Sequence, residues 1–204
     1  MVNVYLLPAD EGDFIWVKYG EKENYANILI DGGTKDSGAE YAEVIEFIES
    51  NGEAIEAIIL THIDYDHLQG TVDGISRVSS ETLKKTVKRI LFNTCRGILR
   101  QQGQTLAKNE YAEDQIKGNI FSGGYGIEDT IAFMELLKKK EIDDRLIDYI
   151  VSGSKLTWDK GAKISFISPG KKELDNFIKK WEPYCRGQKT ILYTSNSEFV
   201  QNNL

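Results

Sequence analysis

The sequence predicts a mixed α/β fold in a single domain spanning residues 1–204, and three observations support this class. Three short stretches of strand type occupy the first thirty residues, an amphipathic helix pattern covers residues 38–50, and an apolar run ends at Leu60, directly before a group of histidines and aspartates. Strand and helix patterns that alternate along a chain are typical of α/β proteins. A chain of 204 residues can bury one sizeable core, and no linker composition divides it.

The first third of the chain gives the clearest pattern. Val2–Leu7, Phe14–Lys18 and Ala26–Ile30 are short apolar stretches separated by polar turns, which predicts a meander of three strands. Gly38–Ser50 carries apolar side chains at three- and four-residue spacing and is followed by Asn-Gly, which predicts an amphipathic helix and its end. Ala57–Leu60 is a continuous apolar run and predicts a buried strand.

The remainder of the chain predicts further elements from shorter patterns. A glycine-rich loop is expected over residues 119–126, where it could form a lid or a plain turn. The expected helices are Thr71–Val78, a second turn capped by Ser79, Ile127–Lys140 and Glu173–Trp181. The expected strands are Arg89–Phe92 and a pair joined by a turn, Arg145–Val151 and Ala162–Ser168.

Composition describes an ordinary globular protein. The formal charge of −7 and a pI near 5.0 argue against a general polyanion binder. No signal peptide and no run of membrane-spanning length are visible, and the two cysteines, Cys95 and Cys185, fit a reducing compartment. We therefore expect a cytoplasmic protein without a membrane partner.

A cluster of potential metal ligands follows the fourth strand pattern. Both histidines of the chain, His62 and His67, are interleaved with Asp64 and Asp66. Imidazole and carboxylate are ligands for zinc, manganese or iron, and the absence of cysteine argues against a closed structural zinc site. His62 and Asp64 are two residues apart and can share one ion, while Asp66 and His67 suit a turn that leads to a second ion. The alternative is an ordinary loop with turn-forming or helix-capping aspartates.

The segment Thr61–Gly70 resembles the His-x-His-x-Asp-His signature of the metallo-β-lactamase-fold hydrolase superfamily, with Asp64 in place of the second histidine. The strand ending in Asp31-Gly32-Gly33 resembles another landmark of that superfamily. Gly12-Asp13, directly before a strand, is similar to the branch related to the hydrolase domain of bacterial DNA-uptake channel proteins. The resemblance implies an αββα sandwich of the metallo-β-lactamase type.

The resemblance also implies a metal-dependent hydrolase that uses a metal-bound hydroxide. His62 and Asp64 would hold a first divalent ion, and Asp66 and His67 a second, so that one or two ions are expected, with Asp66 also orienting or deprotonating the nucleophile. Zinc is the expected metal, and the carboxylate of Asp64 shifts the expectation partly toward manganese. Asp31 would hydrogen-bond a ligand imidazole or the ligand loop, although a plain Asp-Gly-Gly turn is the alternative.

The expected substrate is a small molecule or nucleotide, and nucleic acid is included. A phosphodiester is favoured over a lactone, β-lactam or thioester because of the DNA-uptake-like opening and a basic stretch without acids between Thr82 and Asn109. The functional interpretation of this stretch is a positive rim that attracts an anionic substrate, and the alternative is an ordinary solvated surface. Its basic residues are Lys84, Lys85, Lys88, Arg89, Arg96, Arg100 and Lys108.

The end of the chain departs from the resembled pattern. No histidine follows His67, and Thr190–Ser197 resembles the strand entry that precedes the superfamily's Gly-Asp metal-bridging turn. We therefore expect the closing strands and helix to be missing from this chain. The alternative function is a catalytically incomplete domain that serves as an interaction module or is completed by a partner. A half-built sandwich would expose an apolar face, so self-association is expected.

Overall fold

The computed structural model describes residues 1–105, 126–187 and 194–195. They belong to two compact units, of which the first takes Met1–Phe92, Tyr125–Ile147 and Thr157–Lys163 and the second takes the rest. Each unit is described by itself. The prediction of a single domain stays a prediction.

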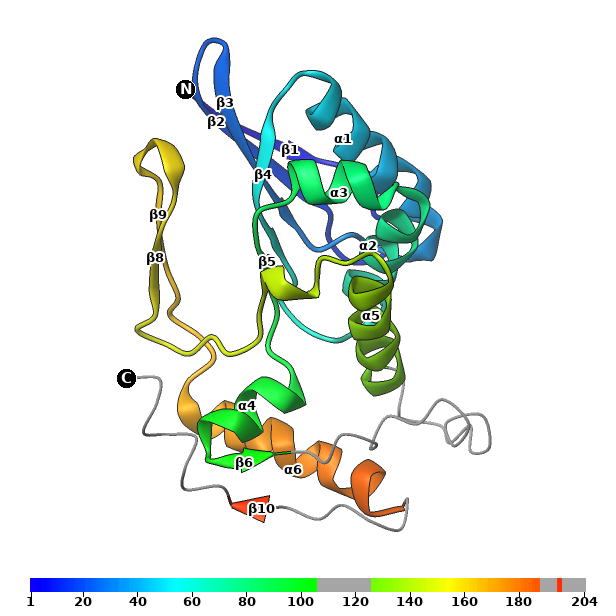
Figure 1. The fold of residues 1–204 in the computed structure, drawn as a ribbon, viewed down its shortest axis with the longest axis vertical. Helices are drawn as coiled ribbons and strands as arrows, with labels where there is room; N and C mark the ends of the chain where they lie inside the picture. Colours follow the sequence, from blue (N-terminus) through cyan, green and yellow to red (C-terminus); the bar gives the residue numbers. More distant parts are fainter. Residues whose placement is uncertain (106–125, 188–193, 196–204) are drawn as a thin grey trace. The chain divides into compact units, whose positions relative to one another are not determined.

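The first unit is built on a six-stranded mixed sheet (Figure 1). The antiparallel pairs β1–β2 and β2–β3 form the predicted meander, and β3, β4, β5 and β7 run parallel to one another. This arrangement confirms the α/β class and is consistent with the metallo-β-lactamase fold. In spatial order the strands are β1 (Val2–Leu6), β2 (Ile15–Glu21), β3 (Asn24–Ile30), β4 (Ala54–Ile59), β5 (Ile90–Leu91) and β7 (Leu146–Ile147).

Helices of this unit gather on one face of the sheet, where α1 and α3 lie next to β4 (Figure 1). The core between them contains fully buried side chains of the strands and helices, such as Leu29, Ile45 and Ile58. The helices are α1 (Gly38–Ser50), α2 (Tyr65–Arg77), α3 (Ser80–Thr86) and α5 (Ile127–Lys139), with short 3-10 helices η1 (Lys35–Ser37), η3 (Asp143–Arg145) and η4 (Asp159–Gly161). The prediction for α1 is confirmed at both ends, and Ser79 caps α3 by accepting from the Thr82 amide.

The edge strand β1 is unusually exposed for an apolar sequence. Val2, Val4 and Leu6 alternate along the strand and are 67%, 60% and 79% exposed, while Tyr5 on the other face packs against Trp16. An uncharged edge strand can pair with another chain. The exposed residues of β1 therefore bear on the expected self-association.

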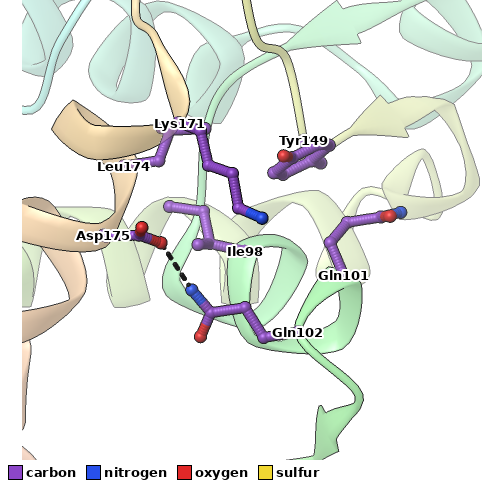
Figure 2. Close-up of a pocket in the computed structure, with 7 residues that line it drawn as sticks. All are labelled: Ile98, Gln101, Gln102, Tyr149, Lys171, Leu174 and Asp175. Carbon is purple, nitrogen blue, oxygen red and sulfur yellow. Dashed lines mark hydrogen bonds between the residues drawn. The ribbon is translucent and has the colours of Figure 1, made fainter.

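The second unit contains α4 (Cys95–Gln101), α6 (Lys171–Gly187) and the paired strands β6 (Gln104–Thr105) and β10 (Thr194–Ser195). β8 (Lys155–Thr157) and β9 (Lys163–Ser165) form a separate two-stranded sheet. Figure 2 shows a small polar pocket between α4 and α6, where Gln102 donates to Asp175 at 2.8 Å and Lys171 extends toward Tyr149. The pocket contains none of the predicted ligands.

Three predictions of secondary structure need correction. The helix predicted from Thr71 begins at Tyr65, and α4 was not predicted at all. The segment Arg145–Val151 forms only the short β7, which pairs with β5, and β9 pairs with β8 instead. Two-residue strands depend on distant partners, so local patterns do not fix their ends. Residues 119–125 of the predicted loop lie outside the described part of the chain, as does most of Thr190–Ser197.

Within the described residues, no helix combines the length and the apolar character needed to cross a lipid bilayer. The cytoplasmic location stays a prediction.

Candidate metal centre

The predicted ligands lie where two neighbouring parallel strands end. In the register of β3 and β4, Ile30 pairs with Ile59, so Asp31 and Leu60 follow side by side and Thr61 comes next. The Asp31 amide donates to the Ile59 carbonyl at 2.8 Å, and the Gly32 amide donates to the His67 carbonyl at 2.9 Å. Segments that follow the carboxyl ends of parallel strands meet at one edge of the sheet, where sites commonly form. Backbone contacts thus bind the Asp-Gly-Gly turn to the ligand loop.

The second half of the cluster belongs to a helix and not to the turn that the sequence predicts. Asp64 has the extended backbone of an N-cap residue, and α2 begins at Tyr65, so Asp66 and His67 lie in its first turn. The Asp64 carboxylate makes no capping hydrogen bond and is 70% exposed, which leaves it available to a ligand. The two aspartates and His67 are therefore held by a helix start.

Asp31 is the buried centre of the site. Its side chain is 2% exposed, and its backbone has the unusual left-handed φ of 53°. The Thr61 amide donates to Oδ1 at 2.8 Å and the Thr61 hydroxyl donates to Oδ2 at 2.5 Å. His67 Nδ1 lies 3.0 Å from the same Oδ2, and because a carboxylate only accepts, Nδ1 carries the proton. Asp31 thus contacts the imidazole of His67 and the segment that begins at Thr61, and its role toward a metal ligand stays a prediction.

The two imidazoles turn their Nε2 atoms toward the predicted carboxylates. His67 Nε2 lies 3.4 Å from Asp66 Oδ2, and His62 Nε2 lies 3.6 Å from Asp64 Oδ2. The ring centroids of His62 and His67 are 3.8 Å apart. The structure therefore places each predicted aspartate beside one of the two histidines, in the two pairs that the spacing suggests.

The donor set fits a divalent cation. One ligand atom each of Asp31, His62 and His67 lies within 4.8 Å of the other two. Both oxygens of Asp31 already accept hydrogen bonds, so Asp31 is placed to orient an imidazole, and the ligand roles of His62, Asp64, Asp66 and His67 stay a prediction. Imidazole nitrogen with carboxylate oxygen suits zinc and, with more oxygen, manganese.

Sequence reasoning gave no role to Asp13, although the Gly-Asp pair before β2 was a visible signal. Asp13 Oδ2 lies 4.0 Å from His67 Nδ1, and the Gly33 amide donates to the Asp13 carbonyl at 2.8 Å. The preceding Gly12 packs so closely that a Cβ there would lie 1.8 Å from the Asp66 carbonyl oxygen. The loop before β2 is therefore part of the wall of the site.

The predicted positive rim is not supported by the described side chains. Six of the seven basic residues in that stretch contact a carboxylate, and Lys108 lies outside the described residues. The contacts are Lys84–Glu141, Lys85–Glu49, Lys88–Glu56, Arg89–Glu56, Arg96–Asp148 and Arg100–Asp148. Because these six basic side chains share four carboxylates, most of their charge is compensated locally, and the structure favours the alternative of an ordinary charged surface.

The fold and this cluster define a mixed α/β protein with a histidine and aspartate site of metal-ligating type at the end of a central strand. Residues 22–73 match the model of the metallo-beta-lactamase superfamily. This segment includes Asp31 and the whole cluster of residues 62–67, so the predicted superfamily is supported where the site lies. The DNA-uptake branch stays a prediction.

Three curated proteins that the chain resembles share one description. The chain is 27% identical over 146 residues to a hydroxyacylglutathione hydrolase of Psychromonas ingrahamii, which covers 62% of this chain and 54% of the relative. It is 31% identical over 72 residues to the enzyme of the same description from Saccharophagus degradans, covering 35% of this chain and 24% of the relative. The chain thus spans about half the length of the first relative. A crystal structure of a candidate metallo-beta-lactamase from Thermotoga maritima aligns with a TM-score of 0.33 and 12% identity, covering 76% of this chain and 61% of that one.

Proposed function

We propose that this chain is a metal-dependent hydrolase domain of the metallo-β-lactamase superfamily. The observation that carries the proposal is the pair of imidazoles whose Nε2 atoms lie next to Asp64 and Asp66 while Asp31 holds the opposite side of the site. His62 with Asp64, and Asp66 with His67, would hold one or two divalent ions. Zinc is the first candidate, and manganese is the second because of the carboxylate at Asp64.

Each side chain of the site would have a separate role in hydrolysis. A bound divalent ion would lower the pKa of a coordinated water and polarise the electrophile. Asp66 is 37% exposed and 3.4 Å from His67 Nε2, so its carboxylate can orient the attacking water and accept its proton. Asp31 fixes the direction of the His67 ring, and the loop of Gly12 and Asp13 packs closely against the start of α2.

For the substrate, we propose a small-molecule acyl thioester first. The curated relatives that the chain matches are hydroxyacylglutathione hydrolases. The phosphodiester or nucleotide substrate that the sequence favoured depended partly on the basic stretch, whose described charges are paired with acids. Phosphodiesters, including nucleic acid, are therefore the second substrate class to assay.

Metal analysis and two hydrolysis assays test the proposal. The purified chain, loaded with zinc or manganese, is assayed with S-lactoylglutathione and with bis(p-nitrophenyl) phosphate. We expect bound metal and turnover that the His62→Ala variant loses and that Asp36→Asn, an exposed acid outside the cluster, retains. Bound metal without turnover above the His62→Ala background would contradict hydrolysis.

A second candidate function is a catalytically incomplete domain that acts as an interaction or partner-completed module. The specific observation in its favour is that the sequence contains two histidines, both in one cluster. Metal binding without hydrolysis, followed by turnover once a partner is added, would support this candidate.

Self-association in a cytoplasmic setting completes the proposal. The exposed Val2, Val4 and Leu6 of the edge strand β1 offer an uncharged strand to a second copy. Sedimentation velocity should show a dimer or larger species that Val4→Lys converts to monomer. A wild-type protein that stays monomeric at high concentration would refute the proposed self-association.

A further inference from the structure

Thr61 lies between the buried carboxylate and the first histidine of the cluster. Its hydroxyl is 2.5 Å from Asp31 Oδ2 and 2.8 Å from His62 Nδ1. A threonine hydroxyl has one proton to donate and can accept in return. The directions of these two hydrogen bonds therefore decide which nitrogen of His62 carries the proton.

The carboxylate settles the direction. A carboxylate only accepts hydrogen bonds, so the Thr61 hydroxyl donates to Asp31. With that proton used, Thr61 Oγ1 can only accept from His62, and Nδ1 of His62 must carry a proton. His67 reaches the same oxygen of Asp31 directly, with Nδ1 at 3.0 Å, and its Nδ1 carries a proton for the same reason.

We propose that Thr61 is a positioning residue that transmits the charge of Asp31 to His62, so that one buried carboxylate fixes the tautomer of both histidines. Each ring then keeps an unprotonated Nε2, and these are the atoms that lie 3.6 Å from Asp64 Oδ2 and 3.4 Å from Asp66 Oδ2. The relay aligns both lone pairs with the carboxylates before any ion binds. This inference rests on the proposed function only in treating the Nε2 atoms as metal ligands.

The environment of the relay suits this role. Asp31 is almost fully buried, so its interaction with the two donors is weakly screened by solvent. The Thr61 amide also donates to Asp31 Oδ1 at 2.8 Å, which fixes the backbone from which the hydroxyl extends. His62 has a 43% exposed side chain, and its Nδ1 contact with Thr61 restrains a ring that otherwise faces solvent. Loss of the hydroxyl should therefore affect His62 more than His67.

Imidazole nitrogen NMR on the metal-free, ¹⁵N-labelled chain tests the tautomers directly, since there are only two rings to assign. His62→Ala identifies the signals of His62. At a pH where both rings are neutral, we expect both to show a protonated Nδ1 in the wild type. Thr61→Val should remove that preference in His62 and leave His67 unchanged, and Thr61→Ser should restore it. A His62 signal that is insensitive to Thr61→Val would overturn the proposal.

Zinc affinity gives the second readout, measured by competition with a chromophoric chelator. Loss of a partner that orients a ligand histidine typically weakens binding about 10- to 100-fold, and we expect this for Thr61→Val with recovery in Thr61→Ser. Thr82→Val, at the cap of α3, serves as the control for a threonine-to-valine change. Equal losses in Thr61→Val and Thr61→Ser would refute the relay. The tautomer measurement needs neither metal nor turnover, so absence of hydrolysis would count against the proposed function alone.

Discussion

The contact between Gly12 and the start of α2 makes a prediction that can be worked from the structure. Gly12 has a φ of +80°, and an added Cβ would lie 1.8 Å from the carbonyl oxygen of Asp66 and 2.6 Å from its carbonyl carbon. Gly52 has a similar φ of +69° with no atom within 4 Å of its added Cβ. The two positions therefore share the backbone strain of alanine in the left-handed region and differ only in the contact.

The magnitudes follow from this comparison. Alanine at a left-handed position costs about 1–2 kcal/mol, which is the expected loss of stability for Gly52→Ala. Gly12→Ala adds an overlap that forces the Asp66 carbonyl to retreat, and overpacking of this kind adds roughly 1–3 kcal/mol. We expect a total loss of about 2–5 kcal/mol for Gly12→Ala.

Urea unfolding followed by circular dichroism measures both variants against the wild type. Zinc affinity is measured in parallel, because displacement of Asp66 should weaken binding in Gly12→Ala, whereas Gly52→Ala should bind as the wild type does. Equal losses of stability in the two variants, with unchanged zinc affinity in both, would refute this prediction. They would show that Gly12 is not in close contact with the start of α2.

Three further predictions concern the core, the sheet and the metal. Burial raises the pKa of Tyr41 above its usual value of about 10, so its contribution to folding stability is fully present below pH ~10 and is lost as the pH rises further. In urea unfolding, Tyr41→Phe should therefore reduce the loss of stability at alkaline pH. Glu56→Gln should lower the unfolding free energy by about 1–3 kcal/mol, because a buried carboxylate with two basic partners loses its charge, while the exposed control Glu46→Gln should change it little. Asp64→His should raise the preference for zinc over manganese several-fold in competition dialysis.

The parts of the fold that the sequence predicts best are those with a local cause. The bounds of α1 follow from its apolar spacing and from the Asn51-Gly52 end, and the structure reproduces them. The start of α2 was missed because glycine weakens a helix pattern. Gly70 and Gly74 are needed there for contact, since a Cβ would lie 1.8 Å from the Gly32 carbonyl oxygen and 2.6 Å from the Tyr41 ring, respectively. Packing thus places glycines where local propensity argues against a helix.

The same division applies to the candidate site. The four predicted ligands are close in sequence, so their spacing alone indicates a cluster. The positions of Asp13 and Thr61 depend on how separate strands end, and this is set by the register of the sheet. The compensation of the basic stretch was also invisible, because partners such as Glu141 and Asp148 lie about fifty residues away in the chain.

The register between β3 and β4 is set by an irregularity in β4. Asn27 pairs with Ile55 and Ile28 pairs with Ala57, so Glu56 is an extra residue in the ladder between β3 and β4. Without this bulge, Ile30 would face Ile58, and the residues after the two strands would meet one position out of step. The bulge is what brings Asp31 opposite the segment that begins at Thr61.

Glu56, the extra residue of the bulge, forms ion pairs with two basic side chains. Its carboxylate is 1% exposed and lies 2.5 Å from Lys88 Nζ and 3.2 Å from Arg89 Nη1, on the chain that leads into the neighbouring β5. Burial of an acid without partners would be strongly unfavourable, so the two basic side chains stabilise the irregular strand. Lys88 and Arg89, two residues of the predicted positive rim, thus stabilise the irregular part of β4. Through that register they help to determine which donors the Asp31 carboxylate meets.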